Sequence, residues 1–230
     1  MKNSQKYLQE LASHLQLLDH EADGIAAAAA ILAQAQNENR LIHVFGTEPA
    51  TASLVTEIFF KPGVPMNINP ILDPSLDPAH GAYRSAMCME LDNLSACILD
   101  YYEYVEAGEP IVLIGSNPKL PMFADALEWS KVKGLKTIAI VCADASYTAC
   151  DADITLHTHG VYADTLAHVE GVSAGGEQTA LTACLLNMLV IETLERLHQP
   201  AENVWSGEHT VDLQANATAI NERLFRIRHL

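Results

Sequence analysis

The feature that most constrains the fold is a short apolar run, residues 41–45, which ends at Gly46 and Thr47. A polar stretch at residues 37–40 precedes the run. This pattern is typical of a buried parallel strand that ends in a tight turn. Beyond the turn, apolar residues recur at the spacing of a helix face: Ala52, Val55, Ile58 and Phe59. A strand, a turn and a helix start make the place where an open α/β sheet binds ligands, because a helix N-terminus offers free N–H groups.

Four further segments are predicted strands, the first of them at a sheet edge. Pro65 and Pro70 keep residues 65–72 out of the sheet centre, because proline lacks the N–H that a central strand donates. The other three are short apolar runs at residues 110–114, 135–141 and 152–156. Strands that alternate with helices predict right-handed parallel crossovers and helices on both faces of the sheet.

Long helical regions are predicted before, between and after these strands. Residues 4–36 form an amphipathic region, which we expect to break or kink at Gly24 and to serve partly as a lid on the core and partly as a dimer arm. Residues 81–100 and 177–197 form two further helices, and a last helix lies in the tail. Their expected buried positions are Met87, Leu91, Leu94 and Ile98, then Leu181, Leu185, Met188, Leu189 and Ile191, then Leu213, Ile220, Leu224 and Ile227.

Length and composition predict one globular domain. The chain has 230 residues, of which 49% are hydrophobic, enough for a full α/β core. Since no linker or repeat interrupts it, we expect a single domain over residues 1–230, with residues 1–37 as a helical arm and residues 198–230 as a tail. No apolar run reaches membrane-spanning length, and residues 1–5 lack the apolar segment of a signal peptide. Five cysteines without a CxxC pair fit free thiols, so we expect a cytoplasmic protein with no membrane partner.

The net charge of −16 argues against nucleic acid as a partner, because phosphate backbones are bound by basic patches. The same charge does nothing to attract a phosphorylated small molecule. A phosphate site in this chain would therefore depend on local backbone N–H groups and hydroxyls.

Several short segments, taken in order, resemble those of sugar isomerase (SIS) domain proteins. They are residues 42–47, 69–72, 114–117, 133–140 and 227–230. Within that family the chain looks most like an uncharacterised bacterial branch related to phosphoheptose isomerase. The resemblance implies a three-layer α-β-α sandwich of the flavodoxin-like kind, with a five-stranded parallel sheet. It also implies homodimers or homotetramers with sites near the subunit boundaries.

The two loops that bind phosphate in such proteins differ here. The first loop of this branch would resemble Gly-Thr-Gly-His-Ser, whereas Glu48 stands here in place of a glycine and Pro49 removes one N–H donor. The second would resemble Ser-Asn-Ser-Gly, whereas Pro118 follows Asn117 here. Both changes weaken the predicted phosphate site, although Lys119 offers a compensating positive charge.

The resemblance implies a glutamate and a histidine that move protons. Glu57 lies where a phosphoheptose-isomerase-like enzyme carries its base, and the alternative is a solvated or interface helix residue. His80 and His209 are the candidates for opening the sugar ring. Ser53 stands where that enzyme has a zinc-binding histidine, so no metal and no cofactor is predicted.

Other polar residues gather at the predicted strand ends. Glu48 is a second acid or base, a charge that excludes phosphate, or an exposed loop residue. The remaining expected ligand contacts, whose alternative role is helix capping, are Gly46, Thr47, Ser116, Asn117 and Ser146. A weak metal-like pattern occurs at His157, His159 and His168, with Asp164 nearby, and surface histidines are favoured over a metal site. Glu177 is interpreted as complementing a helix dipole.

These observations favour a protein that binds a sugar or a sugar phosphate as a homodimer or homotetramer. One hypothesis is binding without turnover, as in a sensor, a regulator or a degenerate isomerase. The alternative is an aldose–ketose phosphosugar isomerase with Glu57 as base. A weaker alternative is a sugar-phosphate lyase or etherase on the same fold, with Glu57 or Glu48 as base.

Overall fold

The computed structural model describes residues 2–101, 105–142, 149–161 and 163–230 of the chain. Its centre is a sheet of five parallel strands in the order β2-β1-β3-β4-β5. The strands are β1 (Ile42–Gly46), β2 (Ile68–Ile71), β3 (Pro110–Ile114), β4 (Lys136–Val141) and β5 (Ile154–His157). The sheet confirms the predicted α/β fold. β2 lies at the edge, where the missing N–H of Pro70 leaves no central pairing broken.

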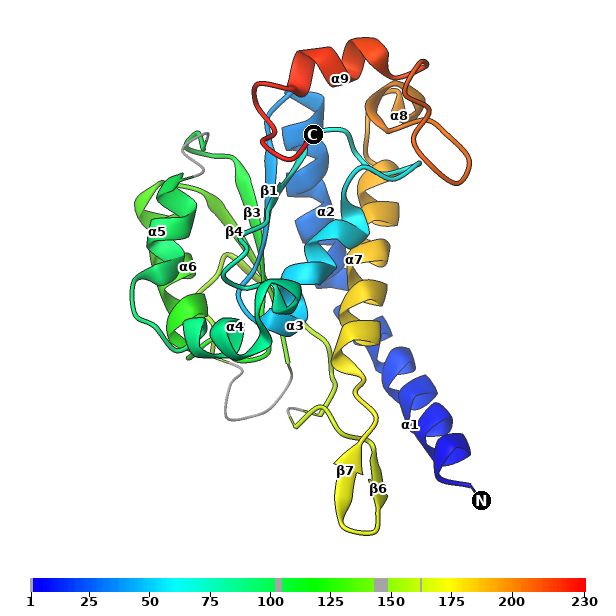
Figure 1. Cartoon of the computed structure of the whole chain (residues 1–230). Coiled ribbons are helices and arrows are strands. Elements are labelled where there is room, and N and C mark those ends of the chain that lie inside the picture. The colour runs from blue at the N-terminus through cyan, green and yellow to red at the C-terminus, as the bar shows by residue number, and fades with distance from the viewer. Residues whose placement is uncertain (1, 102–104, 143–148, 162) are drawn as a thin grey trace.

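Helices cover both faces of the sheet and make the three layers visible in Figure 1. On one face lie α2 (Ala22–Asn37) and α7 (Gln178–Leu194), and on the other lie α5 (Leu94–Tyr101) and α6 (Pro121–Val132). Side chains alternate along β1, as they must on a pleated strand. Ile42 and Val44 therefore pack with α2 and α7, while Phe45 packs with α5 and α6.

The N-terminal arm breaks earlier than predicted. Helix α1 (Asn3–Leu17) passes through a 3₁₀ turn, η1 (Leu18–Glu21), into α2, so the break is not at Gly24. Gly24 lies inside α2, where a Cβ would come within 2.8 Å of Leu156 Cδ2 on β5, so this glycine permits close packing of helix on sheet. Helix α1 buries no residue and extends away from the body of the molecule (Figure 1).

Two predicted helices are shorter than expected. After β1 comes the single turn α3 (Pro49–Ala52) and then the 3₁₀ helix η2 (Ser53–Ile58). After β2, η3 (Pro78–His80) leads to α4 (Ala82–Cys88), and the chain turns at Asn93, with φ 59°, before α5. Because of this break, Met87 and Leu91 are exposed and the prediction that they face inward was wrong, whereas Ile98 is buried.

The C-terminal third differs in detail. A small antiparallel hairpin, β6 (Ala167–Val169) and β7 (Val172–Ala174), lies between β5 and α7. In α7, Leu181, Leu185 and Leu189 are buried as predicted, but Ile191 is exposed. The tail forms α8 (Pro200–Asn203) and α9 (Ala217–Arg223). Leu213 and Leu224 are exposed there, contrary to prediction, while Ile227 is buried.

Among the described residues, every helix is too short or too polar to span a membrane.

A buried polar network joins β1, β2 and Glu109, the residue that precedes β3. His43 on β1 is fully buried, and its Nε2 lies 2.9 Å from Oε2 of Glu109. Asn69 on β2 donates from Nδ2 to His43 Nδ1 at 3.0 Å. Burial opposes the ionisation of Glu109. Its hydrogen bonds with His43 and with the N–H groups of Glu106 and Leu41 nevertheless hold its pKa below the ordinary value.

We predict that Glu109→Ala lowers the free energy of unfolding by about 3–5 kcal/mol, because it leaves His43 buried without its partner. Denaturant unfolding at neutral pH measures the change. Glu106→Ala is the matched control, since its side chain is exposed, and we expect a change within about 0.5 kcal/mol. Equal effects of the two substitutions would contradict a structural role for the network.

Candidate functional site

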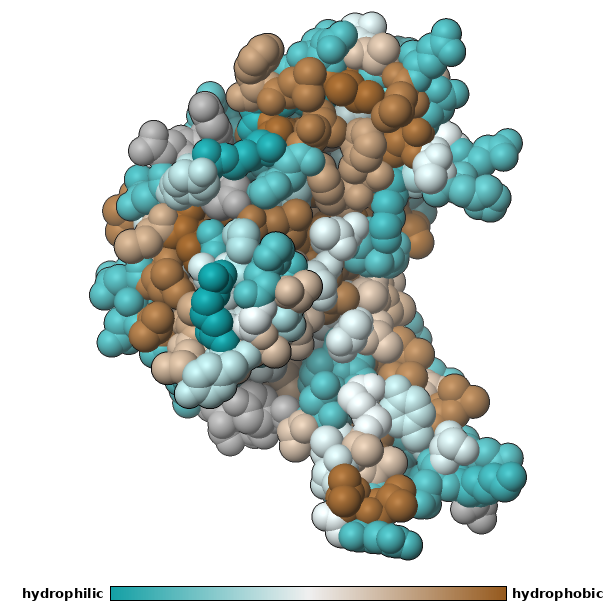
Figure 2. Space-filling model, in the orientation of Figure 1, coloured by the Kyte–Doolittle hydropathy of each residue, from teal (hydrophilic) through white to brown (hydrophobic). Residues whose placement is uncertain are grey.

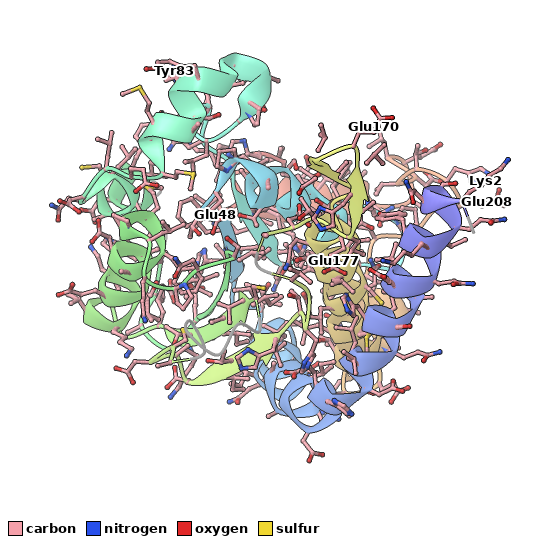
Figure 3. The ribbon with its side chains drawn as sticks, turned by 90° about the horizontal axis from the view of Figure 1, so that it is seen from below. Lys2, Glu48, Tyr83, Glu170, Glu177 and Glu208 are labelled. Atoms are coloured by element: carbon pink, nitrogen blue, oxygen red, sulfur yellow. The ribbon has the colours of Figure 1, made fainter. Side chains whose placement is uncertain are left out.

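The candidate site lies where β1 and β3 end side by side. Gly46 closes β1 opposite Ile114 of β3, and the following loops carry Glu48 and Ser116. Figure 3, seen from below, shows Glu48 left of the middle of the view and, to its right, Glu177, which precedes α7. The topology thus brings the predicted ligand-side loops together.

The carboxylate of Glu48 accepts the hydrogen bonds that the loop after β3 donates. Its Oε1 accepts from the backbone N–H of Ser116 at 2.6 Å and from the N–H of Asn117 at 3.4 Å. Its Oε2 accepts from the Ser116 hydroxyl at 2.7 Å. A cluster of backbone N–H groups and a hydroxyl at the end of a parallel strand is the kind of site that binds an anion. Here the anion is a side chain of the same chain.

Two glycines, Gly46 and Gly115, allow the loops after β1 and β3 to lie this close together. A Cβ at Gly46 would lie 2.4 Å from the carbonyl oxygen of Thr51, and one at Gly115 would lie 2.5 Å from Thr47 Oγ1. The Thr47 hydroxyl donates to the carbonyl of Ile114, so it fixes the backbone. Glu48 itself caps α3, since its N–H donates to Thr51 Oγ1 at 3.1 Å. Glu48 is therefore buried, not the exposed loop residue that was one sequence alternative.

Burial raises the pKa of Glu48 above its ordinary value, and the hydrogen bonds from Ser116 and Asn117 offset part of that effect. The group is thus more easily protonated than an exposed glutamate. Its hydrogen-bond donors nevertheless suit the ionised form, which accepts on both oxygens.

A cavity of about 340 Å³ lies beside this site, at the end of β2. Ala52, the last residue of α3, lines it, so the cavity borders the same short helix that Glu48 caps. Its polar lining comes from η2, from the loop after β2 and from the end of the chain: Ser53, Thr56, Asp73, Asp77, His80 and His229. His80 thus faces a cavity, as expected of a ligand-side histidine. Sequence reasoning did not name His229 as a site residue, although residues 227–230 are one of the segments that carry the family resemblance.

The other predicted catalytic residues lie elsewhere. Glu57 pairs with Lys61 Nζ at 2.9 Å and accepts from Asn187 Nδ2 on α7 at 3.3 Å. The Lys61 hydrogen bond holds the pKa of Glu57 below its ordinary value despite partial burial. His209 is exposed on a tail loop. In the part of the chain that the structure describes, no hydrogen bond or ion pair joins Glu57, His80 and His209 to one another. Ser146 lies outside the described residues.

A second internal carboxylate occupies the start of α7. Asp164 Oδ1 accepts from the N–H groups of Glu177 and Gln178 at 2.6 and 2.8 Å. The buried Glu177 side chain accepts from the N–H of Val161 at 2.6 Å and bonds to His14 of α1. Glu177 therefore anchors the arm and does more than complement the helix dipole. Sequence reasoning missed the pairing with His14, because the two residues lie far apart in the chain.

The three histidines of the predicted weak metal pattern do not gather. His159 bonds to Glu21 at 2.6 Å, and the backbone N–H of His157 donates to the same carboxylate. His168 contacts Ser173 on the hairpin. Within the described ranges, no group of three or more His, Cys, Asp or Glu side chains is placed to hold a metal ion.

We predict a pH-dependent effect of Glu48→Gln. Because the pKa of Glu48 is raised on folding, its contribution to stability is full below about pH 4.5 and is lost as the pH rises through the folded-state pKa. The stability of the wild type relative to Glu48→Gln should therefore fall as the pH rises above about 4.5, as measured by denaturant unfolding at a series of pH values. The same comparison with Glu57→Gln should be flat, since that pKa is lowered. A difference that grows with pH for Glu48→Gln would contradict the assignment.

Comparisons with known proteins agree with this fold. The sequence profile of the SIS domain matches residues 6–142. A UPF0309 protein of Geobacillus kaustophilus is 25% identical over 203 residues, covering 82% of this chain and 80% of the relative. A UPF0309 protein of Caldanaerobacter subterraneus subsp. tengcongensis is 24% identical over 245 residues, covering 97% and 98%.

Two solved structures share the architecture. A phosphoheptose isomerase from Francisella tularensis superposes with a TM-score of 0.54 at 14% identity, covering 85% of this chain and 100% of that one. The sugar isomerase domain of an RpiR transcription factor from Sphaerobacter thermophilus gives 0.52 at 16% identity, covering 85% and 91%. At these identities the likeness concerns the fold. Because the profile match spans more than half of the chain, this protein belongs to the SIS domain family.

Proposed function

We propose that this protein binds a sugar or sugar derivative at the carboxyl end of its sheet, without holding a phosphate in the loop after β3. The observation that carries the proposal is the Glu48 carboxylate on the N–H groups of Ser116 and Asn117. A phosphate in that loop would need the same donors. It would also lie against a buried carboxylate, and like charges repel strongly where water is excluded.

The structural neighbours support a sugar as the class of ligand but leave turnover open. One is named a phosphoheptose isomerase, and another is the sugar isomerase domain of a transcription factor. An enzyme and a regulator thus share this fold. Binding without turnover fits the filled phosphate loop better, because an isomerase needs its phosphosugar held in one orientation.

The alternative is an aldose–ketose phosphosugar isomerase with Glu57 as the base. Against it, Glu57 pairs with Lys61 and Asn187 and does not line the cavity, and its lowered pKa makes it a weaker base. Proton exchange at C2 of a sugar phosphate that Glu57→Gln abolishes would favour the enzyme. The lyase or etherase hypothesis needs the same kind of base, so the position of Glu57 outside the cavity does not support it either.

We also propose that residues 1–230 act as one unit in the cytoplasm and assemble as a homodimer or homotetramer. The arm α1 buries none of its residues within the protomer, and Leu8 on it is 64% exposed. Figure 2 shows hydrophobic atoms at the tip of the β6–β7 hairpin, where Val169 and Val172 are exposed. A second copy that covers these residues would explain their exposure. Light scattering at micromolar concentration tests the mass.

We predict that sugars without a phosphate stabilise the wild type at least as well as their phosphorylated forms. Thermal-shift measurements over matched pairs of sugars test this, because ligand at 100 times its dissociation constant adds about 2.7 kcal/mol to stability. Binding of one sugar phosphate at least tenfold tighter than its parent sugar would contradict the proposal.

We predict further that Glu48→Gly gives the protein an affinity for inorganic phosphate that the wild type lacks. The substitution removes the side chain that fills the loop and leaves the N–H donors of Ser116 and Asn117 in place. Glu57→Gln removes the same charge elsewhere and should gain nothing. Equal phosphate binding by all three proteins would show that Glu48 does not compete with phosphate.

A further inference from the structure

We propose that the arm α1 is a latch: its docking on residues 175–177 keeps the loop after β3 closed on Glu48. The latch rests on the proposed function and deepens it, because it names what controls the loop that Glu48 fills. The arm lies beside the start of α7 and the hairpin β6–β7 (Figure 1). Detaching α1 should therefore loosen the candidate site from a distance.

One face of α1 is shaped for this docking. Tyr7, Leu11 and His14 recur at the spacing of a single helix face, and all three are half-buried. The Tyr7 hydroxyl donates to the carbonyl of Gly176 at 2.9 Å. The Tyr7 ring lies over Gly175, where a Cβ would come within 2.9 Å of Tyr7 Cδ2. This glycine therefore leaves the room that the tyrosine ring fills.

The centre of the contact is the carboxylate of Glu177, whose side chain is fully buried. Its Oε2 lies 2.5 Å from Nδ1 of His14, and its Oε1 accepts from the N–H of Val161 at 2.6 Å. A carboxylate only accepts, so the His14 nitrogen donates. Among the described residues, no other hydrogen bond or ion pair reaches Oε2. Because a buried acceptor without its donor is destabilised, loss of the imidazole should move Glu177 toward water and release the N–H of Val161.

A series of hydrogen bonds leads from Val161 to the loop after β3. The Val161 carbonyl accepts from Gln178 Nε2 at 3.0 Å, and the same nitrogen lies 3.0 Å from Cys142 Sγ. The backbone N–H of Cys142, which follows β4, donates to the carbonyl of Ser116 at 3.3 Å. Ser116 in turn donates to Glu48. Movement of Val161 therefore changes the support of the backbone that holds the Glu48 carboxylate.

The alternative is that α1 only supports the start of α7. Asp164 already does this, since its Oδ1 accepts from the N–H groups of Glu177 and Gln178. The first turn of α7 is thus capped without the arm. The group that depends on the arm is the Glu177 side chain, and the backbone that this side chain holds is that of Val161. Docking of α1 therefore acts on the segment beside the strand ends and not on the helix alone.

Amide hydrogen exchange of the full chain without ligand tests the latch, with His14→Ala as the main variant. Exchange reports how often an N–H group opens. We expect exchange at least about tenfold faster at Val161 and at Ser116, as the loss of one hydrogen bond to a charged group predicts. Tyr7→Phe keeps the ring over Gly175 and removes one neutral hydrogen bond, so we expect a smaller acceleration, about threefold, at the same two amides.

Ser13→Ala is the matched control, because among the described residues the Ser13 hydroxyl bonds only within α1, to the carbonyl of Gln9 at 3.0 Å. It should leave both amides unchanged. Faster exchange at Val161 alone would overturn the path to Ser116, and unchanged exchange at both would overturn the latch. Equal acceleration at Val112, in the middle of β3, would show that the arm supports the whole sheet and would also overturn it. Since no sugar is present, failure of the latch leaves the proposed function to its own ligand test.

Discussion

The hydrogen bonds from the loop after β3 to the carboxylate of Glu48 tie the candidate site together. Ser116 and Asn117 follow β3, while Glu48 follows β1 and caps α3, so one side chain links two strand ends and a helix start. The N–H of Asn117 is buried and that of Ser116 is partly buried, so both need an acceptor, because an unsatisfied buried donor costs about 1–3 kcal/mol. In this chain the acceptor is supplied from within, and the loop is therefore complete without a ligand.

The start of α7 shows the same arrangement. Asp164 accepts from the first N–H groups of that helix, where an external anion would otherwise bind. An acidic chain thus uses its own carboxylates to satisfy two positions with positive potential. A ligand of this protein is accordingly expected to bring hydroxyls rather than a phosphate to the sheet edge, and the cavity lined by Ala52 and His80 offers polar partners for them.

Much of the fold could be predicted because it depends on local pattern. The apolar runs at β1, β3 and β4 and the two prolines around β2 specify buried strands and an edge strand without reference to distant residues. The predicted helix boundaries were wrong where tertiary packing and turns override the local sequence pattern. Gly24 looks like a helix breaker, yet it lies inside α2, where its lack of a Cβ leaves room for Leu156 of β5. Residues 81–100 have helical periodicity throughout, but the turn at Asn93 divides them.

The candidate site was less predictable, since its contacts join distant parts of the chain. The position of Glu48 at a helix start, and its possible role in excluding phosphate, followed from the sequence. Its reach to Ser116, 68 residues later, did not. The pairing of Glu177 with His14 spans 163 residues, and His229 reaches the cavity from the end of the chain. Glu57 occupies a position where the family resemblance implies a base, but its partners Lys61 and Asn187 became visible only in three dimensions.

A crystal structure of the protein in concentrated phosphate tests most directly whether the Glu48 carboxylate, and not phosphate, occupies the N–H groups of the loop after β3. If the internal carboxylate has replaced the phosphate of a ligand, Glu48 Oε1 will remain within hydrogen-bond distance of the Ser116 N–H, and no phosphate ion will lie in the loop. A phosphate ion on the N–H groups of Ser116 and Asn117, with the Glu48 side chain turned away, would contradict it.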